Sequence, residues 1–188
     1  MGAPGFLGAL PECFGDDGMA PLEAPPKPAA VLVPLVLHAS GPGILLTRRS
    51  AHLANHAGQV CFPGGRIESG ETPEEAALRE AMEEIGLDPA LPRLAGRLPQ
   101  HLTGTGYEIT PVLGLIEPGF TLTPDASEVA EVFELPLAVL LDPGAPRRES
   151  REWKGRMREY WVWPHAEHFI WGATATILVN LSTALRGR

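Results

Sequence analysis

The chain lacks the residues on which several protein classes depend. Its 188 residues include two cysteines, Cys13 and Cys61, which are too few for a disulfide framework or a cysteine-rich metal cluster. The most apolar run, residues 29–37, contains Pro34 and is far too short to span a bilayer, so no membrane partner is expected. Lys and Arg number 15 against 23 Asp and Glu, and the resulting net charge of −8 argues against a nucleic-acid-binding surface.

A chain of this length is expected to form one domain, which we place at residues 31–188. Residues 1–30 are rich in Pro, Gly and Ala without periodicity, and we interpret them as an irregular arm. This arm lacks the basic start and unbroken apolar stretch of a signal peptide, and Glu12, Asp16 and Asp17 argue against export. Together with the scarcity of cysteine, these features predict a cytoplasmic location.

One helix is predicted with both of its ends. Thr72 is a suitable N-cap, Pro73 suits the first turn, and Glu75 completes a capping box. Gly86 is typical of a helix C-terminus. The sequence therefore predicts a helix from Pro73 to Ile85.

The predicted helix has an apolar side and an acidic side. At 100° per residue, the apolar side is formed by Leu78, Ala81, Met82 and Ile85, and the acidic side by Glu80, Glu83 and Glu84. A solvated acidic face is one interpretation, and most charge runs are of that kind. A second is a site for a hard divalent cation, since carboxylate oxygens are the ligands that Mg²⁺ and Mn²⁺ prefer. The spacing also predicts an ion pair between Arg79 and Glu83.

The residues from Gly65 to Leu87 resemble the Nudix box. Its fixed positions are filled by Gly65, Glu71, Arg79, Glu80, Glu83, Glu84 and Gly86. Leu87 and the smaller Ala81 fill its apolar positions, and the preceding residues 62–65, Phe-Pro-Gly-Gly, are also similar to the family. The resemblance implies the Nudix α/β fold, a mixed β-sheet sandwiched between α-helices.

The resemblance also implies a metal site for Mg²⁺ or Mn²⁺. Glu80 and Glu84 are its expected main ligands, with Glu83 beside them. Gly65 is expected to lie close to the metal or the phosphate, where a Cβ would be an obstruction.

Other box residues are expected to support this site or take part in the reaction. Glu71 and Gly86 are expected to support the box, and Arg79 to orient the glutamates. A carboxylate, or a metal-bound water that it deprotonates, would supply the nucleophile. Glu83 is the first candidate for that base, with Glu80 and Arg79 beside it in the catalytic group.

An arginine pair precedes the box. Arg48 and Arg49 end a predicted strand, residues 44–47, where guanidinium groups are positioned to bind phosphate oxygens. A surface pair without function is the alternative. The segment resembles the signature of the coenzyme A diphosphatase branch of the Nudix family. The matching residues are Leu45, Leu46, Thr47, Arg49, Ser50, Gly58 and Phe62 to Gly65.

This second resemblance assigns substrate-binding residues with one departure. We expect Thr47, Phe62 and Gly64 to join Arg48 and Arg49 at the substrate. The branch signature has a further Arg where this chain has Ala54. Because coenzyme A carries a 3′-phosphate besides its diphosphate, the missing Arg bears on recognition of either group.

The two resemblances together imply a hydrolase whose partner is a small molecule. It would cleave coenzyme A to 3′,5′-ADP and 4′-phosphopantetheine, or its derivatives to the acyl form. A diphosphatase for ADP-ribose or another nucleotide sugar is the alternative that Ala54 leaves open. A non-catalytic binding module is another, but its mark would be degraded box glutamates, and this chain shows none.

The remaining chain is expected to form strands with few helices. We expect strands at residues 31–38, 94–101, 107–117 and 128–135, a hairpin at 151–163, a short helix at 137–141 and a final helix at 171–185. Trp161, Trp163 and Trp171 either stack on an adenine or pack in the core, and packing is commoner. The histidines show no metal-ligand spacing around the box. Cys61 is expected to be a small buried residue rather than a nucleophile.

Overall fold

The computed structural model describes residues 24–53, 56–153 and 156–187. An 8-stranded mixed sheet forms its centre, with the path β3-β2-β1-β7-β5, while β4 pairs with β1, β6 with β7 and β8 with β2. The strands of this sheet are β1 (Lys27–Val36), β2 (Gly43–Arg49), β3 (Val60–Cys61), β4 (Gly64–Arg66), β5 (Arg93–Arg97), β6 (His101–Leu102), β7 (Tyr107–Ile116) and β8 (Val129–Pro136).

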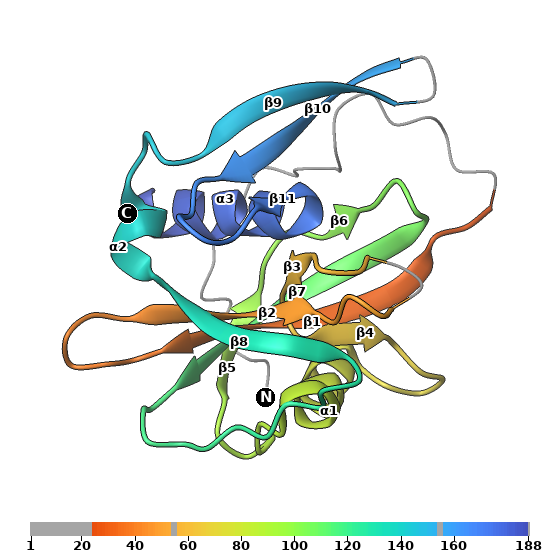
Figure 1. The fold of residues 1–188 in the computed structure, drawn as a ribbon. Coiled ribbons are helices and arrows are strands. Elements are labelled where there is room, and N and C mark those ends of the chain that lie inside the picture. Colours follow the sequence, from red (N-terminus) through yellow and green to blue (C-terminus); the bar gives the residue numbers. More distant parts are fainter. Residues whose placement is uncertain (1–23, 54–55, 154–155, 188) are drawn as a thin grey trace.

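Helices cover both faces of this sheet. Helix α1 (Pro73–Ile85) lies on one face, and α3 (Gly172–Arg186) lies on the other, as Figure 1 shows. A 3-stranded sheet, in the order β11-β10-β9, runs along α3, and the short α2 (Leu137–Leu141) leads into it. Its strands are β9 (Arg147–Trp153), β10 (Arg156–Trp163) and β11 (Ile170–Trp171). The expected sandwich of helices around a mixed sheet is confirmed.

The core is divided in two by β1, which pairs in parallel with β7 along its whole length. Successive side chains of a strand point to opposite faces. Val33 and Leu35 therefore join the cluster beneath α3, while Leu32 and Val36 join the cluster against α1. The central strands are buried on both faces, so they lack the alternation of apolar and polar residues that marks a half-buried strand.

Both predicted ends of α1 are confirmed. The Thr72 hydroxyl accepts from the Glu75 backbone N–H at 3.3 Å, and the Glu75 carboxylate accepts from the Thr72 N–H at 2.8 Å. Gly86 ends the helix with a φ of 67°, a left-handed conformation that side chains rarely adopt. The predicted 137–141 helix is confirmed with its bounds as α2.

The predicted apolar side of α1 is wrong in one part. Met82 is 50% exposed, although we expected it in the core. The residues that α1 buries are Ala76, Ala77, Ala81, Glu84 and Ile85. The three alanines let the helix approach β1 closely, and this orientation carries Glu84 inward and leaves Met82 outside.

Several strand bounds also differ from expectation. β1 begins at Lys27, so residues 27–30 belong to a strand and not to the arm. The hairpin begins at Arg147 rather than 151, and residues 154–155, between its two strands, lie outside the described residues. β3 and β4, of two and three residues, were not predicted because such short runs carry no periodicity.

The three hairpin tryptophans differ in their environments. Trp163 is fully buried beneath α3, which confirms packing as its role. Trp161 lies under the Arg148 guanidinium, 4.8 Å from the ring centroid. Trp171 is 37% exposed and makes an edge contact with Tyr160. None of the helices in the described part of the chain has the length and apolar character needed to cross a membrane.

His101 predicts a specific acid sensitivity of the fold. Burial lowers its pKa to about 4, against the ordinary 6.5, and its Nδ1 has no partner among the described residues. The unfolded chain therefore takes up this proton first, so the stability that neutral His101 contributes is complete above pH 6.5 and is lost as the pH falls toward 4. The loss amounts to about 3 kcal/mol. In urea titrations, His101→Phe should lose correspondingly less stability than wild type over this range. Parallel losses in the two proteins would contradict the assignment.

Candidate functional site

The loop before α1 is held against the helix by β4. Residues of β4 pair with Ala29, Ala30 and Val31 of β1, and this places Gly64 and Gly65 beside the acidic side of α1. A Cβ added to Gly65 would lie 2.6 Å or less from the Glu80 carboxylate atoms. The missing side chain therefore leaves room for the carboxylate.

Glu84 is the most unusual carboxylate of the site. Its side chain is only 4% exposed, and its Oε2 accepts from the Gly64 backbone N–H at 3.1 Å. Arg49 donates to its Oε1 at a long 3.4 Å. Burial raises the pKa of Glu84 to about 7, although the Gly64 hydrogen bond and Arg49 oppose that shift. A carboxylate in this position is costly to ionise unless further positive charge lies close to it.

Arg79 gathers the other carboxylates of the box. Its Nε and Nη2 donate to the two oxygens of Glu71, at 2.7 and 3.1 Å. Its Nη1 donates to Glu80 at 2.9 Å and to Glu83 at 3.0 Å. The predicted pair of Arg79 and Glu83 is therefore present, and Arg79 contacts three carboxylates of the box at once. These hydrogen bonds lower the pKa of Glu71, while partial burial raises the pKa of Glu80.

One carboxylate of the site, Glu128, was not predicted from the sequence. Glu128 immediately precedes β8, and its charge raises the pKa of both Glu80 and Glu84. Ser50 N–H donates to the Glu128 carbonyl at 2.8 Å, which fixes the residue beside the end of β2. Glu128 forms no side-chain ion pair within the described residues. Glu128 lies outside the box motif, so the spacing of the box glutamates did not point to it.

The structure separates the two arginines that were expected to act together. Arg49 points to the α1 face and contacts Glu84. Arg48 donates instead to Glu131 of β8 at 3.0 Å, and Glu131 also lies 3.6 Å from His168 Nε2. Adjacent residues of a strand point to opposite faces, so the pair cannot converge on one group from a regular strand.

The other expected substrate residues shape the loop. Thr47 is fully buried, and its hydroxyl donates to the Cys61 carbonyl at 3.1 Å. Phe62 is buried in the cluster beneath α3. Gly64, by contrast, faces Glu84 through its N–H. Cys61 is partly buried, and burial raises the pKa of its thiol, as suits a structural residue.

The carboxylates fit a divalent cation in chemistry but are not gathered as ligands. In the described ranges, no three carboxylate, imidazole or thiol groups are placed close enough to hold a metal ion. Glu80 and Glu83 are turned to Arg79, and Glu84 to Gly64 and Arg49. The mutual repulsion of Glu80, Glu84 and Glu128 nevertheless calls for positive charge between them, and oxygen donors are what a hard cation requires.

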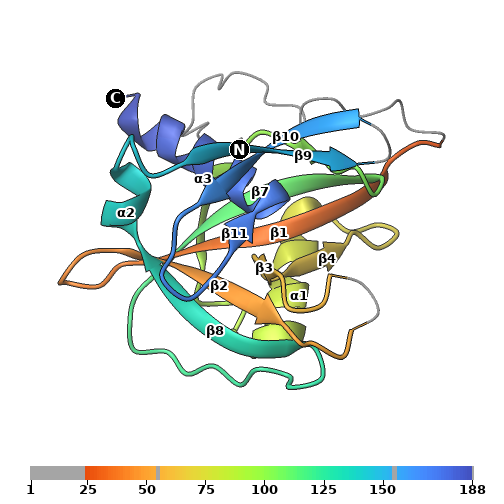
Figure 2. The ribbon, with the colours of Figure 1, turned by 45° about the horizontal axis from the view of Figure 1, so that its top comes forward.

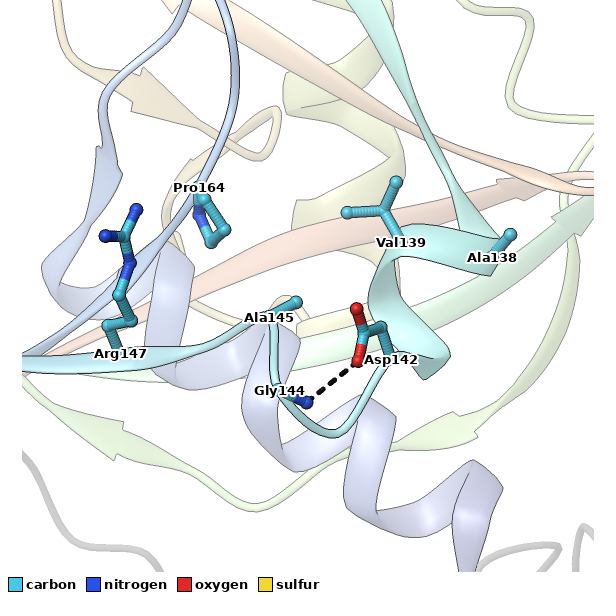
Figure 3. A pocket seen from close by; sticks show the side chains of 7 residues that line it. All are labelled: Ala138, Val139, Asp142, Gly144, Ala145, Arg147 and Pro164. Carbon is cyan, nitrogen blue, oxygen red and sulfur yellow. Dashed lines mark hydrogen bonds between the residues drawn. The ribbon is translucent and has the colours of Figure 1, made fainter.

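A separate hollow of about 660 Å³ lies away from these carboxylates, between α2 and the start of β9. Figure 3 shows its lining residues, Ala138, Val139, Asp142, Gly144, Ala145, Arg147 and Pro164. The Asp142 carboxylate accepts a hydrogen bond from the Gly144 N–H at 2.9 Å. The hollow is open and holds none of the site residues, so it does not bear on the chemistry of the box.

Comparison with known proteins agrees with this geometry. The NUDIX domain model matches residues 26–166. The chain is 41% identical to the protein named uncharacterized Nudix hydrolase NudL of Escherichia coli K12, over 83% of this chain and 81% of that protein. The same protein of Shigella boydii matches equally.

Solved structures support the fold as well. A Nudix hydrolase of M. smegmatis, RenU, superposes with a TM-score of 0.54 and 25% identity, over 63% of this chain and 76% of that one. A MutT/nudix family protein from Enterococcus faecalis gives 0.57 with 19% identity, over 89% and 64%. Members of this family generally use divalent metal ions, and the chain belongs to the Nudix family as an enzyme that hydrolyses pyrophosphate bonds.

Proposed function

We propose that the preferred substrate is coenzyme A or one of its derivatives, cleaved at the diphosphate to release 3′,5′-ADP and 4′-phosphopantetheine or its acyl form. The observation that carries this proposal is the segment from Leu45 to Gly65, which resembles the coenzyme A diphosphatase signature. In the fold, two residues of this segment, Arg49 and Gly64, contact Glu84. Arg49 is the signature residue whose guanidinium reaches that carboxylate. Most of the others, such as Thr47 and Phe62, build the loop around it.

In this proposal, Glu80 and Glu84 hold Mg²⁺ or Mn²⁺, with Glu83 and the Gly65 backbone nearby. The metal supplies charge neutralisation for the diphosphate oxygens. Arg49 retains N–H donors beyond its long contact with Glu84, and these orient a phosphoryl oxygen. Arg79 keeps Glu80 in place through its bidentate pair with Glu71.

Two carboxylates compete for the role of general base. Glu83, our candidate from the sequence, is 59% exposed and bound by Arg79. Glu128 lies close enough to Glu80 and Glu84 to raise the pKa of both, and no cation of the described residues occupies it. We favour Glu128 as the group that would take the proton from the attacking water, because a base must lie within reach of that water.

ADP-ribose or another nucleotide-sugar diphosphate is the second candidate. Ala54, which stands where the signature has Arg, favours it, and that position lies outside the described residues. His56, close to that position, directs its Nδ1 to Gln59 at 2.8 Å in a left-handed turn with a φ of 57°, so this nitrogen is not available to a phosphate.

Replacing each carboxylate of the site by glutamine should lower kcat by an amount that depends on its position. Glu84→Gln and Glu80→Gln are expected to lower kcat by at least about 100-fold, because each removes an anionic metal ligand. Glu128→Gln should lower kcat more than Glu83→Gln. Glu117→Gln, an exposed change, is the control for each. A wild-type rate in Glu84→Gln with an unaltered melting temperature would refute the assignment.

Gly65→Ala tests the space beside Glu80. The added Cβ collides with the carboxylate, so Mn²⁺ binding followed by electron paramagnetic resonance should weaken at least about tenfold. Gly144→Ala is the matched control, because its Cβ would meet only Asp142 at an ordinary 3.4 Å. Equal Mn²⁺ affinity in the two variants would show that this glycine has no part in the metal site.

A substrate panel separates the two candidate functions. We expect kcat/KM for coenzyme A to exceed that for ADP-ribose and NADH by at least about tenfold with Mg²⁺ or Mn²⁺, since only coenzyme A carries the additional phosphate and pantetheine arm. Dephospho-coenzyme A is the control for the 3′-phosphate. A preference for ADP-ribose would replace the proposal with the second candidate.

A further inference from the structure

The outer edge of β9 is unpaired within the described residues. The small sheet has the order β11-β10-β9, so β9 contributes hydrogen bonds to β10 on one side only. Figures 1 and 2 show the β9–β10 hairpin at the periphery, along α3. An edge of this kind is a template for another strand. The side chains of residues 147–152 are all exposed.

The charges of β9 are arranged about its middle residue, Ser150. Arg148 and Glu149 precede it, and Arg151 and Glu152 follow it. Residues at equal distances from Ser150 therefore carry unlike charges. If two copies of β9 pair antiparallel with Ser150 on the twofold axis, Glu149 lies opposite Arg151 of the second copy. Arg148 then lies opposite Glu152 of the second copy. Each contact occurs twice, and directly opposite unlike charges stabilise a pair of strands.

Neighbouring registers are disfavoured by the same residues. The two strands could also pair in a shifted register, with the twofold axis moved by one residue. Such a shift still lets the outward-pointing N–H and C=O groups of the two strands face each other. An axis through Glu149 sets that carboxylate against its own copy, and an axis through Arg151 sets two guanidinium groups together. The sequence of the strand therefore selects the register centred on Ser150.

The hairpin compensates some of these charges, since Arg148 donates to Glu159 at 3.3 Å, but it leaves the charges nearer its tip less well matched. Arg151 lies opposite Arg158 of β10, a like-charge pair that destabilises a hairpin. Neither Arg151 nor Glu152 forms an ion pair within the described part of the chain. Glu149 accepts only a long hydrogen bond, 3.4 Å, from the Tyr160 hydroxyl. A carboxylate brought from outside to Arg151 would relieve the repulsion with Arg158.

We propose that two copies of this chain associate through β9, with Ser150 on the twofold axis. The result is one continuous sheet with the order β11-β10-β9-β9-β10-β11. Charged residues on an edge strand often serve only to prevent aggregation. Here the residues at equal distances from Ser150 carry unlike charges, so these charges favour association with one partner, a second copy of the same strand. This is an isologous interface of the kind that closes at a dimer.

The interface is small, so the dimer is expected to be weak. A strand of seven residues buries less than a standard protein interface, and exposed ion pairs add little each. We therefore expect dissociation constants in the micromolar range. Association should weaken as salt rises from about 50 to 500 mM, because these pairs lie at the surface.

Sedimentation velocity of the full chain between about 1 and 200 µM tests the proposal. Glu149→Arg and Arg151→Glu should each weaken dimerisation at least about tenfold, because each places like charges opposite each other. The double variant, Glu149→Arg with Arg151→Glu, restores unlike pairs and should dimerise within about threefold of wild type. Glu117→Arg, an exposed site outside the hairpin, applies the same change in net charge as Glu149→Arg and should have no effect.

Disulfide formation tests the register independently of stability. Under oxidation, Ser150→Cys should give a crosslinked dimer, because the two introduced thiols meet on the axis, whereas Arg147→Cys should not exceed the wild-type background. A chain that stays monomeric, a Glu149→Arg variant that associates like wild type, or equal crosslinking at both positions would each overturn the proposal. So would dimers that form only after deletion of residues 1–23, since that segment would then be the occupant of the edge.

Discussion

The buried carboxylate of Glu84 is the interaction on which the rest of the site depends. A single backbone N–H, from Gly64, and one distant guanidinium, from Arg49, compensate its removal from water. That is little for a group only 4% exposed, and its raised pKa reflects the shortfall. The position is maintained because the alanine side of α1 packs on β1 and the capping box fixes where the helix begins. The fold thus holds a carboxylate where more positive charge is needed.

Arg79 and Arg49 bind different carboxylates on the acidic side of α1. Arg79 binds Glu71, Glu80 and Glu83 together, so three carboxylates share one cation. Arg49 contacts Glu84, and Glu128 adds negative charge without an ion pair in the described residues. The solvated acidic face considered at first therefore does not describe this helix, because its key carboxylate is buried and its neighbours are held by arginine.

Much of the fold was predictable because its signals are local. The capping box, the Pro at the first turn and Gly86 define α1 from neighbouring residues alone. The site was less predictable because it depends on contacts between distant segments. Glu128 reaches the box only through the pairing of β2 with β8. The opposed directions of Arg48 and Arg49 follow from strand periodicity, which was available from the sequence once the strand was extended through both residues. Met82 was wrongly predicted to be buried, because helical spacing alone does not decide which of two adjacent faces of α1 packs against the sheet.

Diffraction from crystals soaked in Mn²⁺ tests the central claim most directly, because the anomalous signal locates the ion without reference to activity. The account predicts one peak or more within about 2.5 Å of carboxylate oxygens of Glu80 and Glu84, with both side chains turned away from their arginine partners. A peak elsewhere, or no peak at millimolar Mn²⁺ while Glu80 remains on Arg79 and Glu84 on Arg49, would contradict it.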